Sequence, residues 1–142
     1  MSAKDTNNTD KLLKQLESLF KKEITVGLHG DVGKDNLTKG FANEFGTKNI
    51  PERSFIRAGF DAEKGNINRD AEKLVKKVVA MEIKSQTAAE LLGDTAKGRI
   101  QEFAIDLRDP PNAASTIKQK GSSNPLVDTG QMIGSIDYKV KG

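Results

Sequence analysis

The middle of the sequence carries two long stretches with helical periodicity, and no other feature limits the possible folds as strongly. From about Ile67 to Lys84, apolar residues recur at intervals of three and four, which places them on one helical face. The segment Thr87–Glu90 fits a capping box and starts a second stretch of this kind, which Pro110 and Pro111 stop. Two long helices joined by so few residues pack as an antiparallel pair or continue as one helix with a kink.

The two ends of the chain show the period-two alternation of strands instead. In residues 23–29, Ile24, Val26 and Leu28 fall on one face, and residues 135–140 alternate in the same way. Strands at both ends with helices between them predict an α+β fold. We expect a small antiparallel sheet packed against two long helices, with a flexible arm before the C-terminal strand.

Two shorter helices are expected before the long pair. Residues 11–22 carry leucines and a phenylalanine at helical spacing, with Lys and Glu between them, which predicts an amphipathic helix. Asn36 is placed to cap a second helix, which Gly46 ends. Residues 50–55 are predicted to be extended, because Pro51 disfavours the helical conformation of the residue before it.

The domain organisation predicted from the sequence is simple. A chain of 142 residues suits one domain with one modest core. Residues 1–10 are polar with nothing to bury, which predicts a disordered N-terminal arm. Residues 11–142 then form a single α+β domain. Within it, residues 112–124 are rich in Ser, Lys, Gly and Asn and are predicted to be a mobile loop or an arm ordered on assembly.

The composition argues against several classes of protein. The chain has no cysteine, so neither disulfides nor thiolate metal sites are expected. No apolar run approaches the roughly 18–20 residues that span a bilayer, and the N-terminus lacks the apolar stretch of a signal peptide, which predicts synthesis in the cytoplasm. The net charge of +3 comes from scattered Lys and Arg, which favours a solvated mixed-charge surface over a nucleic-acid site.

One triplet imitates a catalytic motif. Asp128-Thr129-Gly130 follows two apolar residues, as the catalytic Asp of an aspartic protease does. Only 12 residues follow Gly130, too few for the further strands of such an enzyme, and the helical middle contradicts an all-β barrel. We interpret the triplet as a turn in which Asp128 or Thr129 caps a short helix that carries Met132 and Ile133.

A glycine-rich loop imitates a second motif. Residues 27–35 place Gly33-Lys34 after the first expected strand, as in a phosphate-binding loop. That motif requires glycine where Leu28 stands and Ser or Thr where Asp35 stands, so we interpret the segment as a strand-to-helix turn. His29 is the single histidine and has no nucleophile motif beside it. No catalytic residue, cofactor site or metal site is predicted.

Arg53, Phe55 and Arg57 are candidates for a subunit interface. Arginine with an aromatic neighbour is typical of interface anchors. The alternative is that Phe55 packs inward and both arginines are solvated, and the sequence leaves both open.

Four segments occur in a characteristic order. They are Val26–Gly30, Asn43–Arg57, Ser115–Lys120 and Pro125–Met132. In order and spacing they resemble the small neck and tail-completion proteins of tailed bacteriophages, whose pattern reads NEFGT…IPERPFLR and later PLIDTG. The chain departs from that pattern at Ser54, Ile56 and Val127, where the family has proline, leucine and isoleucine.

The resemblance implies a non-enzymatic structural protein of the virion. It implies a subunit that joins the tail to the head connector, or alternatively a tail terminator or minor tail component of the same region. Such a subunit forms rings, often hexameric, with copies of itself and contacts other neck, connector and tail-tube proteins. DNA would be passing cargo, and no membrane is involved. A small basic nucleic-acid-binding module is a remote alternative. The residues expected at subunit interfaces are Arg53, Phe55, Arg57, Lys118, Lys120 and Asp128.

Overall fold

A computed structural model describes residues 3–49, 52, 54–106 and 130–142. The elements in chain order are α1 (Ala3–Phe20), β1 (Glu23–Gly27), the 3-10 turn η1 (Gly30–Val32), α2 (Lys34–Phe45), α3 (Phe55–Val79), α4 (Ser85–Asp106), α6 (Gly130–Gly134) and β2 (Asp137–Lys141). The predicted mobile segment at residues 112–124 lies outside the described residues, as do Asp128 and Thr129.

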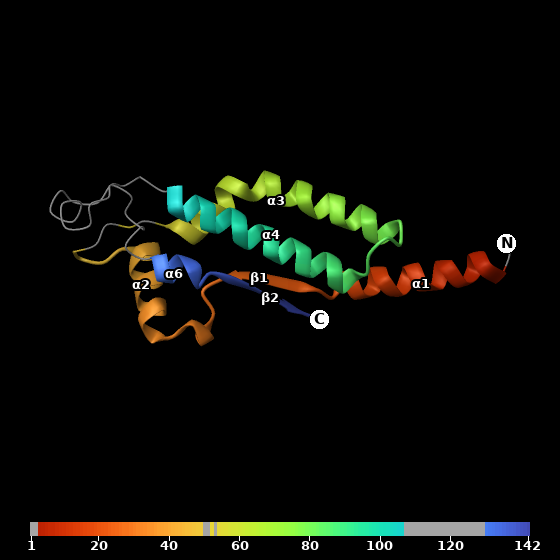
Figure 1. Ribbon diagram of the computed structural model, residues 1–142, viewed down its shortest axis with the longest axis horizontal. Coiled ribbons are helices and arrows are strands. Elements are labelled where there is room, and N and C mark those ends of the chain that lie inside the picture. Colours follow the sequence, from red (N-terminus) through yellow and green to blue (C-terminus); the bar gives the residue numbers. More distant parts are fainter. Residues whose placement is uncertain (1–2, 50–51, 53, 107–129) are drawn as a thin grey trace. The chain divides into compact units, whose positions relative to one another are not determined.

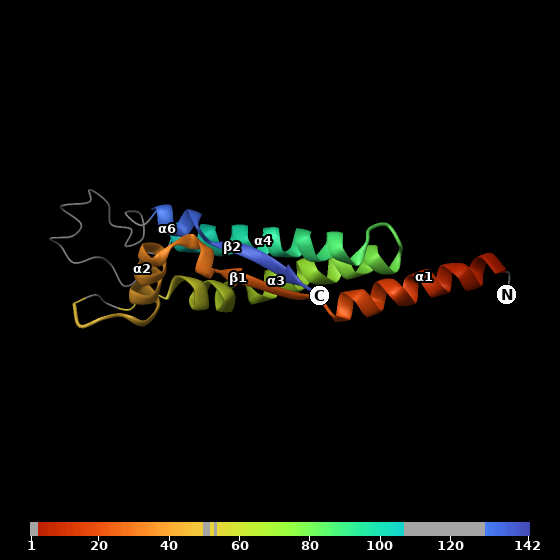
Figure 2. The same cartoon turned by 90° about the horizontal axis from the view of Figure 1, so that it is seen from below.

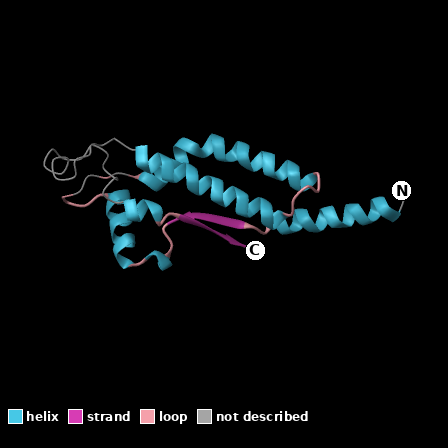
Figure 3. Cartoon of the chain, in the orientation of Figure 1, coloured by secondary structure: helices cyan, strands magenta, loops and turns pink. Residues whose placement is uncertain are grey.

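The chain is α+β, as the sequence predicts. In the described residues β1 and β2 form a two-stranded antiparallel sheet that contacts α4, and α3 and α4 are the two long helices (Figure 1 and Figure 3). The chain contains two compact units. The first unit contains Met1–Thr25, Gly65–Ala96 and Tyr138–Gly142, and the second contains Val26–Lys64 and Lys97–Asp137. Within each unit, α3 and α4 lie side by side (Figure 1 and Figure 2).

Both long helices start earlier than the sequence indicates. The periodic pattern begins near Ile67, whereas α3 begins at Phe55, in the segment predicted to be extended. The carbonyl of Ser54 accepts the first helical bond, from the N–H of Ala58 at 3.2 Å. The second helix begins at Ser85 and not at Thr87. In both helices, a side chain from another element accepts a hydrogen bond from the first turn. The local sequence pattern does not reveal that bond.

The start of α2 also differs from the prediction, although its end agrees. Gly33, and not Asn36, precedes the first residue of α2. The Asn36 amide instead donates to the Val32 carbonyl at 3.0 Å and to the Ser135 hydroxyl at 3.3 Å, which ties α2 to the chain just before β2. At the other end Gly46 stops the helix as predicted, with φ 74°, a left-handed conformation that glycine adopts without strain.

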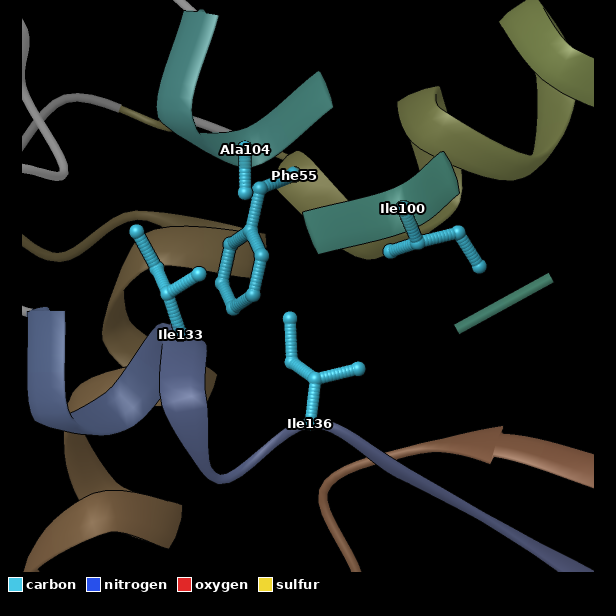
Figure 4. Packing of buried hydrophobic residues seen from close by; sticks show 5 residues of the cluster. All are labelled: Phe55, Ile100, Ala104, Ile133 and Ile136. Carbon is cyan, nitrogen blue, oxygen red and sulfur yellow. The ribbon is translucent and has the colours of Figure 1, made fainter. Parts of the chain in front are cut away.

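The hydrophobic core of the second unit gathers residues that are distant in sequence. Its buried members come from the start of α3, the end of α4, and α6 with the residues after it, as Figure 4 shows. They are Phe55, Ile100, Ala104, Ile133 and Ile136. The Gln101 amide donates to the Ile133 carbonyl at 3.1 Å, so the end of α6 is held to α4 by a hydrogen bond as well as by packing.

The first unit contains one close contact that depends on a glycine. The ring of Tyr138, on β2, packs against α4 where Gly93 lacks a side chain, because a Cβ there would lie 2.4 Å from the ring atom Cδ2. The unit also contains α1, which begins at Ala3 where the sequence suggested a disordered arm over residues 1–10. Ser85, buried at the first turn of α4, fixes α1 by donating its backbone N–H to Gln15 Oε1 at 2.8 Å.

Candidate functional site

The residues predicted to lie at subunit interfaces fall into two groups. Phe55 and Arg57 lie in the described part of the chain. Phe55 is fully buried in the core of the second unit, so it packs inward, the alternative that the sequence left open. Arg57 is half exposed on its side chain. The remaining predicted residues lie outside the described part: Arg53, Lys118, Lys120 and Asp128.

A hydrogen-bond network centred on Glu44 joins the two halves of the segment Asn43–Arg57. The Glu44 carboxylate, from the last turn of α2, accepts a bond from the Ser54 hydroxyl at 3.0 Å and another from the backbone N–H of Ile56. Arg57 donates its Nε to the same carboxylate at 2.9 Å and one Nη2 bond to the Glu44 carbonyl. We call these four residues the Glu44 network. Glu44 is only 7% exposed, so its charge is compensated within the protein.

The Glu44 network caps α3. Ser54 occupies the N-cap position, and the N–H of Ile56 belongs to the first turn, where helices leave N–H groups without internal partners. A carboxylate at this position satisfies such a donor and interacts favourably with the positive end of the helix dipole. Because the carboxylate comes from α2, it fixes the end of one helix to the start of the next. Sequence reasoning missed this role of Glu44, because the spacing of residues within one helix does not show which residues of another helix lie beside it.

The guanidinium of Arg57 is held by several groups at once. Its pKa is raised above the ordinary value, chiefly by the hydrogen bond to Glu44, with Glu52 adding to the effect. The Glu52 carboxylate lies 2.8 Å from Nη2. The guanidinium carbon also lies 4.4 Å from the centre of the Phe45 ring, which is a cation–π contact. Arg57 therefore links the Glu44 network to an exposed aromatic surface.

That aromatic surface lies on the outer side of α2. Phe41 is 69% exposed and Phe45 54% exposed, and their ring centres are 4.8 Å apart. With Leu37 they form a row spaced four residues apart, on one helical face. An open groove of about 460 Å³ runs along this row, and we call it the α2 groove. Its lining residues are Leu37, Thr38, Phe41, Ala42, Phe45, Gly46 and Thr47.

A second exposed apolar surface lies on α1, in the first unit. Phe20 is 83% exposed and Leu13 is 52% exposed. Leu12 and Leu16 are half-buried and share this face. We call these four residues the α1 stripe. Clustered exposed apolar side chains of this kind mark interaction surfaces more often than isolated ones do.

The described residues contain neither a metal-binding cluster nor a membrane-spanning helix. Among them, no group of three or more His, Cys, Asp and Glu side chains is arranged to hold a metal ion. No described helix combines the length and the apolar character needed to cross a membrane. Comparison of the chain with protein-family models, with curated proteins and with solved structures found no match. The surfaces on α1 and α2, together with the Glu44 network between α2 and α3, are therefore the candidate functional features.

Proposed function

We propose that this chain is a non-enzymatic structural subunit of a tailed bacteriophage, which joins the tail to the head connector as part of a ring. The proposal starts from the four segments that resemble neck and tail-completion proteins, above all Asn43–Arg57. A tail terminator or a minor tail component of the same region is the alternative.

One observation carries the proposal furthest. The polar groups of the resembling segment bond within the protein itself, because Ser54 and Arg57 both donate hydrogen bonds to the Glu44 carboxylate. Charged side chains that cap one helix and bond it to the next stabilise the fold of the protein. A catalytic role would require a reactive group directed at a substrate.

The surface is also compatible with assembly. The described residues expose the apolar α1 stripe and the α2 groove with its two phenylalanines. Subunits of obligate assemblies bury apolar surface of this kind against their neighbours. The net charge of +3 is low enough to permit DNA to pass without tight binding.

The decisive experiment uses the phage whose genome carries this sequence. Particles assembled without the protein are purified and examined by cryo-electron microscopy. A joining subunit predicts filled heads and separate tails of normal length, and adding the purified protein back restores joined particles. Tails of uncontrolled length would indicate the terminator role instead. Normal infectious particles that lack the protein would refute any structural role in the virion.

A cleavage assay tests the remaining enzymatic interpretation. The purified chain is incubated with a peptide library at pH 4 to 7, where aspartic proteases act, with an Asp128→Asn variant as the control. We expect the two proteins to give the same background. Cleavage by the unmodified chain that the variant lacks would contradict the proposal.

A further inference from the structure

The long helices α3 and α4 contain four glycines, and packing explains only two of them. Aromatic rings lie against Gly59 and Gly93, where a Cβ would be 3.3 Å and 2.4 Å from the nearest ring atom. At Gly65 and Gly98, no atom of the described residues lies within 4 Å of the Cβ position, apart from the neighbouring backbone of the same helix. A glycine inside a helix is less favourable than alanine, because its backbone loses more conformational freedom on folding. Close packing does not account for that cost at Gly65 and Gly98.

Both of these glycines lie where a long helix passes from one compact unit to the other. In α3 the boundary falls between Lys64 and Gly65. In α4 it falls between Ala96 and Lys97, one residue before Gly98. Few contacts cross the boundary of a compact unit. A helix that continues through such a boundary depends there mainly on its own backbone hydrogen bonds, which glycine weakens.

An ion pair joins the two helices beside both glycines. Arg99 Nη1 lies 3.4 Å from Glu63 Oε2, and both side chains are partly buried, with 31% and 25% of their surface exposed. Arg99 directly follows Gly98 in α4, and Glu63 stands two residues before Gly65 in α3. A change in the direction of one helix at its glycine therefore acts on the other helix through this pair.

We propose that Gly65 and Gly98 form a hinge at which α3 and α4 bend as a pair. Glycine accepts the backbone angles of a bent or locally opened turn without the Cβ clashes that restrict other residues. Helix bends have identifiable local causes, and glycine is one of them. The hinge goes beyond the proposed function and does not depend on it. It is tested on the purified protein, so either proposal can fail alone.

The first measurement is hydrogen exchange of the backbone amides of the unmodified chain, followed residue by residue by NMR. Exchange of this kind reports local opening of a structure that is otherwise folded. After correction for the intrinsic rate of each residue, we expect lower protection within about one turn of Gly65 and of Gly98 than in the turns on either side. Uniform protection along both helices would overturn the proposal.

The second measurement tests whether the helices bend together, with Gly65→Ala as the variant. We expect exchange to slow by about two- to five-fold near residue 65 and also near Gly98, the factor that corresponds to the advantage of alanine over glycine in a helix. Asn68→Ala is the matched control, because Asn68 is exposed one turn further along α3 and alanine there also raises helix propensity. We expect the control to leave exchange near Gly98 unchanged. Slowing by Gly65→Ala that is confined to α3, or equal slowing near Gly98 in both variants, would overturn the proposal.

Discussion

The carboxylate of Glu44 and the guanidinium of Arg57 hold α2 to α3 through a bond of 2.9 Å between Oε2 and Nε. The same carboxylate accepts the N–H of Ile56 and so closes the first turn of α3. Two helices are thereby joined at their adjacent ends by one side chain. Glu52, which lies between the two helices in the sequence, contacts the same arginine, with 2.8 Å between its Oε1 and Arg57 Nη2.

Replacing Glu44 with Gln should destabilise the protein markedly. The neutral amide cannot accept all of the bonds that the carboxylate accepts, and hydrogen bonds to a charged group are worth about 1.5–3 kcal/mol. The loss is measured as a shift of the urea unfolding midpoint. Glu52→Gln is the matched control, since Glu52 is exposed and pairs with the same arginine. We expect the control to lose less than about 1 kcal/mol. Equal losses in the two variants would show that burial of Glu44 is unimportant.

The contribution of Arg57 to stability should not depend on pH in the ordinary range. Its folded-state pKa is raised, mainly by the bond to Glu44, so the guanidinium stabilises the protein fully below its unfolded pKa. That stabilisation is lost only in strong alkali, as the pH rises through the folded pKa. An Arg57→Lys variant behaves differently, because lysine titrates near pH 10.4 in model peptides. We expect the gap in unfolding midpoint between the two proteins to be constant from pH 7 to about pH 10 and to widen as the pH rises above about 10.4, where the lysine loses its proton. A gap that stays constant above that pH would mean that the charge at this position is not what matters.

Gly93→Ala should destabilise the first unit through a steric clash. A Cβ at Gly93 would lie 2.4 Å from the Tyr138 ring, so the ring or the strand that carries it has to move. Overpacking of this kind costs about 1–3 kcal/mol. Gly98→Ala on the same helix is the control, since no atom lies within 4 Å of its Cβ position. There we expect a gain of about 0.5–1 kcal/mol from helix propensity. Thermal unfolding of both variants checks the opposite signs.

Two isoleucines on α4 should differ sharply in their effect on stability. Ile100 is fully buried in the core of the second unit, whereas Ile105 is 51% exposed. Ile100→Ala removes packed side-chain atoms and leaves a cavity, at a cost of about 2–5 kcal/mol. Ile105→Ala should change the free energy of unfolding by no more than about 0.5 kcal/mol. Urea unfolding of both variants measures the difference, and similar losses would place the core elsewhere.

Sequence patterns were reliable where the determinant is local. The helical stripes of the long pair, the alternation at both ends and the glycine at position 46 all depend on residues a few positions apart. The same patterns failed at the starts of helices. Asn36 looks like a cap but donates to Ser135, 99 residues away in sequence. The start of α3 was missed because its capping group belongs to Glu44, on another helix.

The sequence by itself determined the α+β class, the presence of two long helices and the absence of cysteine, because spacing and composition specify these directly. Tertiary structure alone decided that Phe55 is buried in the core and that Gly93 is a packing site for Tyr138. It also decided that Gln15 and Ser18 of α1 hydrogen-bond to Ser85 at the first turn of α4. Such choices depend on which distant groups meet, and the periodicity of one helix does not contain that information.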